Sequence, residues 1–302
     1  MVGRKRVLSD EGLKLFNVSM GENKEIVRNY GCLKSLVLNL LTSDFDIKLD
    51  NTSVQLRKAS QKMYSYLSDN DKKYIPSLID NAITNIILLI LLDDGKINKL
   101  QKIKYNINYY VHLAKRAHLH GDHHTAILIK AALENGALRR LHMKSKKSEQ
   151  KILKELEDSY GTFMDCNSQH LRTILTAKET DIENFLPSIM VILMHLNKTR
   201  EYAKSYKSLG MVTDRLIKTQ FQLQQIVNDY YVHYKNYSEN LLELYLQNPL
   251  DNPVLNSMPS KSTACKLYDL SYKILPSNDK LNKNTFSSLK RTKPNRAIIT
   301  HH

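Results

Sequence analysis

The chain has 302 residues, of which 42% are hydrophobic, nine are glycine and seven are proline. Such scarce glycine leaves few residues for the tight turns of a many-stranded sheet, so the composition predicts an all-α protein. The formal net charge of +15 favours anionic partners in general, without choosing among nucleic acid, acidic proteins and lipid.

The cysteines and the apolar runs limit where the protein works. Cys32, Cys166 and Cys265 are odd in number and far apart, which argues against a disulfide framework and fits a reducing compartment. The longest apolar run, Ile86–Leu92, is far shorter than the ~20 residues that span a bilayer. No apolar signal segment follows the basic residues Met1–Arg6. We therefore expect a cytoplasmic protein.

Apolar residues at helical spacing predict a series of helices along most of the chain. These helices cover residues 24–41, 54–67, 76–92, 99–119, 123–134, 149–160, 168–177, 188–204, 214–234 and 238–247. Residues 42–53 are polar and are expected to form a connection. The segment 76–92 is apolar on nearly all sides, which is typical of a helix at the centre of a bundle.

Three regions are expected from these patterns. Residues 1–55 form a helical N-terminal preamble, and residues 56–247 form the main helical domain. Residues 248–302 are rich in Ser, Asn, Pro and Lys and are expected to be a mostly disordered basic tail. From Lys280 onward this tail carries six basic residues and no acid, so it is a candidate for contact with an anionic membrane surface.

One short stretch has the spacing of a metal-binding motif. His118, His120, Asp122 and His123 follow the pattern HxHxDH, which resembles the metallo-β-lactamase superfamily over six residues. In that superfamily the loop follows a β-strand, whereas here helices are predicted on both sides. Because a motif outside its structural context is weak, zinc-dependent hydrolysis is the third hypothesis, and we predict neither a metal nor a cofactor.

Read for periodicity, the same stretch is a turn between two helices. Gly121 and Asp122 are expected to end one helix, with Asp122 as the N-cap of the next, over residues 123–134. His120 and His124 would then lie on different segments, although their spacing would suit a metal within one helix.

This turn and the segments after it resemble the catalytic domain of Ras-type guanine nucleotide exchange factors. In that family a turn of the type N-N-F-N precedes a helix of the form xAIxxAL and then an Arg-Leu pair. Here Gly121–His124 form the turn, followed by Thr125–Leu133 and Leu138–Leu141. Asp122 and His124 replace asparagines of the family's turn.

Later segments continue the resemblance in the same order, so that it covers roughly residues 100–247. They are Ser148–Glu157, His170–Leu175, Phe185–Leu196, which loosely matches IPFxGxxLxxL, and Asn197–Tyr237. Ser188 and Ile189 replace aromatic residues of the family. The resemblance implies a multi-helix bundle with a protruding helical hairpin.

The resemblance also implies a function without covalent chemistry, so the protein is not expected to be an enzyme in that sense. It would promote GDP release from a Ras-superfamily small GTPase. The hairpin, at about Lys198–Arg215, would insert beside the nucleotide and displace a switch of the GTPase. The remote match and the Lys/Asn/Ile-rich composition suggest a bacterial effector that acts on host GTPases in the host cytosol.

Particular residues follow from this alignment. Glu201, Arg200 and Lys204 are the candidates for disturbing magnesium and phosphate contacts, with Glu201 foremost. The candidate GTPase contacts are Asp122, His124, Arg140, Ile189, Lys198 and Arg215. Ile189, Ile192, Leu193 and Leu196 would hold the base of the hairpin rigidly by apolar packing.

A contrasting hypothesis is a basic helical adaptor without exchange activity, which would bind an anionic membrane or nucleic acid. No arginine–glycine or aromatic–basic signature of a nucleic-acid module is present, so nucleic acid is not the expected partner.

Overall fold

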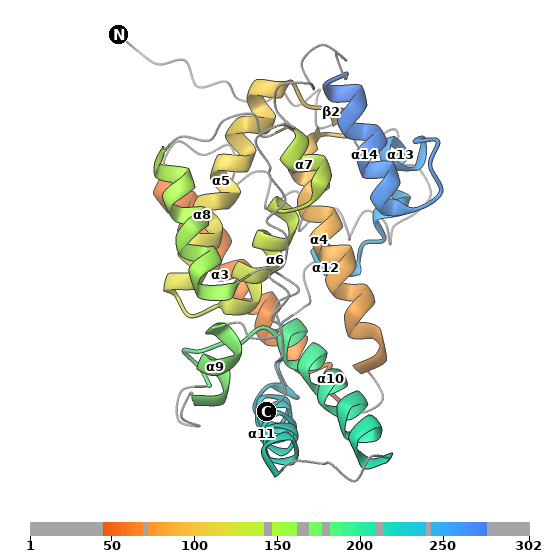
Figure 1. The fold of residues 1–302 in the computed structure, drawn as a ribbon. Coiled ribbons are helices and arrows are strands. Elements are labelled where there is room, and N and C mark those ends of the chain that lie inside the picture. Colours follow the sequence, from red (N-terminus) through yellow and green to blue (C-terminus); the bar gives the residue numbers. More distant parts are fainter. Residues whose placement is uncertain are drawn as a thin grey trace, which may run out of the picture.

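Helices form nearly all of the regular structure in the residues that the computed structural model describes, which are 45–68, 72–141, 147–161, 169–176, 182–208, 214–239 and 243–276. The prediction of an all-α fold is therefore confirmed (Figure 1). The preamble helix predicted over 24–41 lies outside the described residues.

The elements before the turn at residues 120–122 are α3 (Phe45–Tyr64), η1 (Lys72–Tyr74), α4 (Ile75–Leu91), β1 (Leu92–Asp93), β2 (Lys96–Ile97) and α5 (Leu100–Leu119). The elements that follow are α6 (His123–Leu133), α7 (Gly136–Leu141), α8 (Lys147–Tyr160), α9 (Gln169–Thr176), α10 (Ile189–Ser208), α11 (Asp214–Tyr234), α12 (Glu243–Leu246), η3 (Pro249–Asp251), α13 (Pro253–Asn256) and α14 (Thr263–Ile274). The strands β1 and β2 pair antiparallel through the turn Asp94–Gly95, in which both residues have positive φ, as a two-residue hairpin requires.

The centre of the bundle is formed by α4, α5 and α6. Helix α4 begins with Pro76 in its first turn and packs against α6 and α12. The stretch Lys72–Leu91 is the one among the described residues that could cross a membrane by length and composition. Because 56% of its most apolar window is buried inside the protein, its position is that of a core helix, as its all-round apolar pattern predicts.

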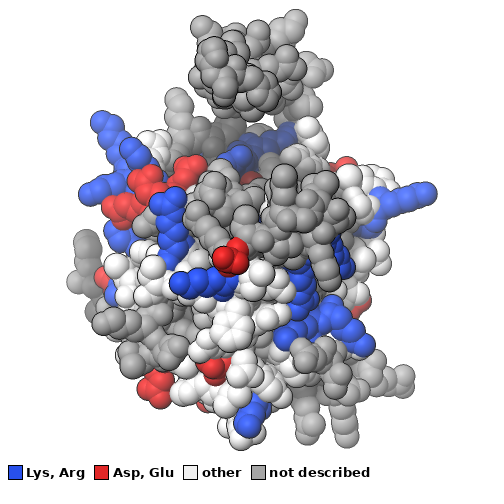
Figure 2. Space-filling view, turned by 60° about the horizontal axis from the view of Figure 1, so that its bottom comes forward, with Lys and Arg blue, Asp and Glu red and all other residues white. Residues whose placement is uncertain are grey.

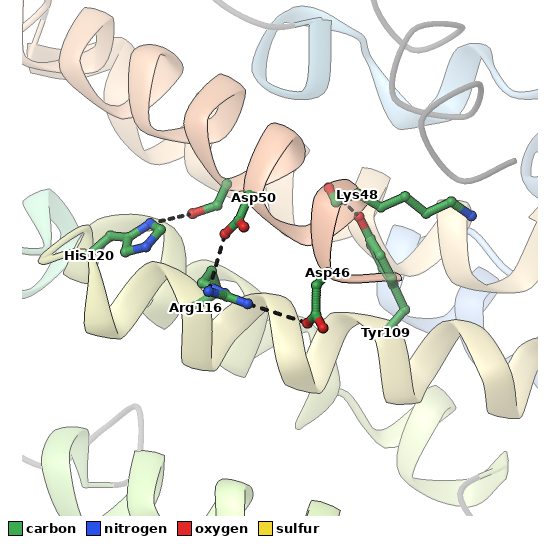
Figure 3. A network of polar contacts seen from close by, with 7 residues as sticks. Asp46, Lys48, Asp50, Tyr109, Arg116 and His120 are labelled. Atoms are coloured by element: carbon green, nitrogen blue, oxygen red, sulfur yellow. Dashed lines mark hydrogen bonds and ion pairs between the residues drawn. The ribbon is translucent and has the colours of Figure 1, made fainter. Parts of the chain in front are cut away.

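Helices α3 and α5 lie side by side and are joined by polar contacts (Figure 3). Arg116 contacts Asp46 at 3.4 Å and Asp50 at 3.3 Å, while the hydroxyl of Tyr109 lies 2.8 Å from the Thr52 hydroxyl. The two ion pairs are partly exposed and add little stability, whereas the Tyr109–Thr52 bond is buried. The start of α3 therefore belongs to the main body.

The domain boundaries differ from those expected from the sequence. Residues 45–55 are part of α3, so the boundary expected at 55/56 falls within a helix. Residues 249–276 form η3, α13 and α14, and α14 packs against α7. This part of the expected tail belongs to the helical body, because its apolar side chains, such as Leu267 and Leu270, are buried there. Residues 277–302 lie outside the described residues.

Arg140 joins α14 to the rest of the bundle. Its guanidinium donates hydrogen bonds to the carbonyls of Ser271, at 2.9 Å, and Leu275, which lie at the end of α14. It also lies over the ring of Tyr272, 3.9 Å from the centroid. A cation at this end satisfies carbonyls that have no partner within the helix, and it interacts favourably with the negative end of the helix dipole.

Arg140→Ala is expected to loosen α14 and to lower the free energy of unfolding by about 1.5–3 kcal/mol, the range for hydrogen bonds that involve a charged group. Urea unfolding measures the loss, and hydrogen exchange localises it to residues 263–275. The neighbouring Arg139 is exposed, so Arg139→Ala is the matched control. Equal stability of the two variants would contradict this role for Arg140.

Candidate functional site

The candidate site is the hairpin of α10 and α11, which pack against each other and extend from the lower end of the bundle in Figure 1. Ile189, Ile192 and Leu196, in the first turns of α10, are 0%, 2% and 4% exposed. Further along the same helix, Arg200, Glu201 and Lys204 are all exposed. Helix α10 thus has an apolar base inside the protein and exposed charged side chains further along, which is the arrangement expected from the sequence.

Two further candidate residues lie on the hairpin. Lys198 is half-buried. The pKa of His195 is lowered mainly by the burial of its own ring and further by the charge of Lys198. Arg215 is in the first turn of α11, and its side chain lies outside the described residues. Leu193, predicted in the apolar base, is half-buried against the core.

The segment before α10, residues 182–188, is neither helix nor sheet, and side chains from distant elements satisfy its carbonyls. Tyr234 donates to the carbonyl of Ile182 at 3.3 Å, Tyr230 to that of Phe185, and Tyr64 to that of Pro187. The three rings lie in contact, with centroids of Tyr64 at 4.8 Å from Tyr230 and 5.6 Å from Tyr234. Helices α3 and α11 therefore fix the backbone from which the hairpin starts.

The turn between α5 and α6 holds the same segment from another side. Leu186 donates its N–H to the carbonyl of Gly121 at 2.8 Å, and His124 donates its N–H to the carbonyl of Leu186 at 3.2 Å. Arg57 links both segments, because its guanidinium donates to the carbonyls of His120, at 2.6 Å, and Glu183. We name residues 120–124 and 182–188 together the hairpin anchor.

Asp122 is the N-cap of α6, as predicted. Its carboxylate accepts the N–H of Thr125 at 3.0 Å and the hydroxyl of Ser60 at 3.2 Å. The side chain is 0% exposed, and burial raises its pKa to about 6 despite these hydrogen bonds. Asp122 therefore positions α6 and is not available for contact with a partner on the surface of this structure.

Gly121 is required by the approach of the two anchor segments. Its φ is +72°, a left-handed conformation that side chains disfavour. A Cβ at this position would lie 2.0 Å from the carbonyl oxygen of Asn184. Only glycine allows the turn to pass this close to the segment before the hairpin.

The histidines of the turn face different surroundings. His118 and His123 place their Nδ1 atoms 2.6 and 2.8 Å from the hydroxyl of Tyr160. Because a hydroxyl has one proton, it can donate to at most one of the two rings, so at least one of these histidines donates from its Nδ1 to Tyr160. The ring of His123 also contacts His170, whose Nε2 accepts the N–H of Ser188 at 3.1 Å. The cluster connects α8 and α9 to the anchor.

His124 is buried elsewhere, with 0% exposure and its ring roughly parallel to that of Tyr245. Neither ring nitrogen has a hydrogen-bond partner among the described residues. Burial lowers its pKa to about 3, so the ring is neutral. The prediction that His124 contacts a GTPase directly does not fit this placement, and neither does that for Ile189, because both side chains are inside the protein.

The zinc alternative does not fit the observed geometry. His118 and His123 are directed at Tyr160. His120 instead points toward α3, with its Nδ1 3.5 Å from the hydroxyl of Ser53 (Figure 3). Within the described ranges, no group of three or more His, Cys, Asp or Glu residues is arranged to hold a metal ion. His118 and His120 are two residues apart at the end of α5, and residues at this spacing do not face each other on a helix.

An open groove of about 590 Å³ lies beside the anchor, between α3 and the end of α11. It is lined by Arg57, Gln61, His120, Glu183, Asn184, His233, Tyr234 and Tyr237. These side chains offer hydrogen-bond donors and acceptors with few apolar groups, so the groove suits a polar backbone or loop of a partner.

In comparisons with known proteins, no family model matches this chain and no curated protein matches it.

Several residues that hold the anchor in place were not singled out from the sequence. The periodicity of α11 places Tyr230 and Tyr234 on its buried face, but it does not reveal that their hydroxyls bind a distant loop. Arg57 gives no signal at all, because its two carbonyl partners are 63 and 126 residues away in the chain.

Gly121→Ala is expected to destabilise the protein more than Gly95→Ala does. Both glycines have positive φ, +72° and +71°, so both variants carry the left-handed cost of about 1–2 kcal/mol. At Gly95 a Cβ meets nothing within 4 Å, whereas at Gly121 it meets the Asn184 carbonyl, which adds about 1–3 kcal/mol for overpacking. Urea unfolding measures the difference, and equal losses would argue against a close contact at the anchor.

Stability is expected to fall as the pH is lowered from 6.5 toward 4. Burial lowers the pKa of His123 to about 4 and those of His124 and His170 to about 3, so unfolding takes up protons below pH 6.5. Each histidine contributes up to about 1.4 kcal/mol per pH unit in this window. Asp122, whose pKa is raised to about 6, takes up its proton on folding between pH 6 and 3.8 and opposes the trend. Burial also raises the pKa of Asp80, so it acts in the same direction as Asp122, while the lowered pKa values of His118 and His195 add to the effect of the three buried histidines.

His124→Phe tests this directly, because it removes one titrating group at a site where the ring nitrogens have no partner. The slope of unfolding free energy against pH should become shallower, with unchanged or higher stability at pH 7. Urea unfolding at pH 7.0, 5.5 and 4.5 gives the slope, and the exposed position His233, as His233→Phe, is the control. An unchanged slope would show that His124 is not held neutral by burial.

Proposed function

We propose that this protein is a guanine nucleotide exchange factor for a Ras-superfamily small GTPase. The observation that carries the proposal is the α10–α11 hairpin, whose base is clamped by the anchor and whose outer part presents Arg200, Glu201 and Lys204 to solvent. This arrangement supports the function implied by the sequence resemblance, because a wedge must be rigid where it is held and polar where it meets nucleotide, magnesium and switch residues.

The proposed mechanism is a coupling of binding free energies. The hairpin makes its contacts with the nucleotide-free GTPase and displaces a switch, so that GDP and the exchange factor weaken each other's binding by the same factor. Glu201 would compete for the magnesium ion and the phosphate-binding lysine of the GTPase. Arg200 and Lys204 would contact the acidic groups that normally hold the magnesium ion. No bond is made or broken, and no cofactor is needed.

The buried candidates have a different role in this proposal. Asp122, His124 and Ile189 hold the anchor together and position the hairpin, rather than touching the partner. Arg140 holds α14 against α7. The polar groove beside the anchor would receive a second loop of the GTPase. The protein would act in a cytosol, and delivery into a host cell as a bacterial effector is part of the same proposal.

The surface that the structure describes mixes charges of both signs. On the face shown in Figure 2, the blue Lys and Arg side chains are scattered and interspersed with acidic and uncharged surface. The net charge of +15 favours anionic partners in general and does not by itself select a nucleic-acid or membrane adaptor.

Release of fluorescent GDP from a panel of small GTPases tests the proposal. The protein should accelerate release from at least one of them, and Glu201→Ala should reduce that acceleration by about fivefold or more, the low end of typical coupling between sites. Glu157→Ala, an exposed glutamate on α8, is the matched control and should have no effect. A protein that leaves every GTPase of the panel unchanged, while binding lipid vesicles or RNA, would support the adaptor instead.

The anchor gives a second variant for the same assay. Tyr230→Phe removes the hydroxyl that holds the Phe185 carbonyl but keeps the ring in place. Exchange should fall while binding of the GTPase is largely kept, because the hairpin would be less rigidly held. An unchanged rate would show that the hydroxyl is not needed for the position of the hairpin.

A further inference from the structure

The outer face of α11 carries apolar side chains that are exposed in the part of the chain that the structure describes. Ile217 is 55% exposed, Phe221 65% and Val232 51%. They lie on the side opposite to Leu223, Val227, Tyr230 and Tyr234, the buried residues that pack on the body. The exposed side is completed by Asp214, Gln224, Gln225, Asn228 and Lys235, with Lys218 on its flank.

The order of these residues is self-complementary in an antiparallel sense. Suppose that two copies of α11 pair antiparallel with their two-fold axis between Gln224 and Gln225. Each residue of one copy then faces the residue of the other copy that lies equally far from the axis on its opposite side in the sequence. Asp214 then faces Lys235 of a second copy, Ile217 faces Val232, and Phe221 faces Asn228. In this register the Asp214 carboxylate meets the Lys235 ammonium, and the two aliphatic side chains meet each other. The ring of Phe221 lies against the side chain of Asn228.

The spacing is also that of a helix pair. Asp214, Ile217, Phe221, Gln224 and Asn228 follow one another at intervals of three, four, three and four residues, which is the pattern of a two-helix seam. A self-complementary patch of this kind forms a closed two-fold dimer rather than an open chain. From Asp214 to Lys235 the seam is about 32 Å long at 1.5 Å per residue.

We propose that this face of α11 is a homodimerisation surface, on which a second copy of the chain docks through its own α11 in the antiparallel register centred between Gln224 and Gln225. The hairpin extends from the body, so antiparallel pairing places the two bodies at opposite ends of the seam (Figure 1). Arg200, Glu201 and Lys204, which carry the proposed exchange function, lie on α10, so the dimer surface is separate from these three residues.

A single pair of helices buries less area than a standard protein interface, so the dimer is weak, with dissociation expected at roughly 0.1 mM. Sedimentation equilibrium of the full chain should give a mass that rises from 35.0 kDa toward twice that value as the concentration increases. Phe221→Glu should abolish the rise, since it introduces two carboxylates into the seam. Tyr74→Glu, at another exposed aromatic residue outside α11, is the matched control and should dimerise normally.

Charge reversal tests the register itself. Asp214→Lys and Lys235→Asp should each raise the dissociation constant about fivefold or more, because each places like charges at both ends of the seam. The double variant restores opposite charges and should return the dissociation constant to near the wild-type value. Both residues are exposed, so circular dichroism should show unchanged folding.

A mass that stays at 35.0 kDa up to about 1 mM would overturn the proposal. So would a dimer that Phe221→Glu leaves intact, or a double variant no tighter than the single ones. None of these results depends on exchange activity, so the proposal can fail while the proposed function stands, and the reverse.

Discussion

The backbone of residues 182–188 forms neither a helix nor a sheet, yet it lies against the bundle where water cannot satisfy all of its polar groups. Each buried carbonyl there needs a donor from elsewhere, since an unpaired buried group costs as much as a lost hydrogen bond. Tyr64 supplies a buried donor, and Tyr230 and Tyr234 supply partly buried ones. Arg57 adds an exposed hydrogen bond to the Glu183 carbonyl. Because α10 starts at Ile189, directly after this segment, the direction of the hairpin depends on these side chains.

The same constraint explains why the turn at residues 120–124 has its composition. Gly121 is there because the Asn184 carbonyl leaves no space for a Cβ, and Asp122 caps α6 while it is buried against Ser60. Asp122 and His124 lie in one of the two segments that pair through Gly121 and Leu186, and Ser188 lies in the other, directly before Ile189. Residues that are distant in the sequence are therefore neighbours in one packed unit.

The hairpin separates its roles by face. One side of α11 packs on the body through buried residues that include Leu223, Val227 and Tyr230. The other side is exposed and apolar at Ile217 and Phe221. Arg200, Glu201 and Lys204 lie on α10 instead. A rigid two-helix extension can in this way present different surfaces to different partners, while a single anchor fixes the position of both.

The sequence by itself determined the helical class, the buried central helix α4, the N-cap at Asp122 and the apolar base with a polar outer part on α10. These features depend on local periodicity and capping, which are properties of neighbouring residues. Only the tertiary structure decided that His124 and Ile189 are buried, that Arg140 holds α14, that residues 249–276 belong to the body, and that Arg57 and the tyrosines clamp the hairpin. Each of these depends on contacts between residues far apart in the chain, and a hydroxyl or guanidinium that binds a distant carbonyl leaves no periodic trace in the sequence.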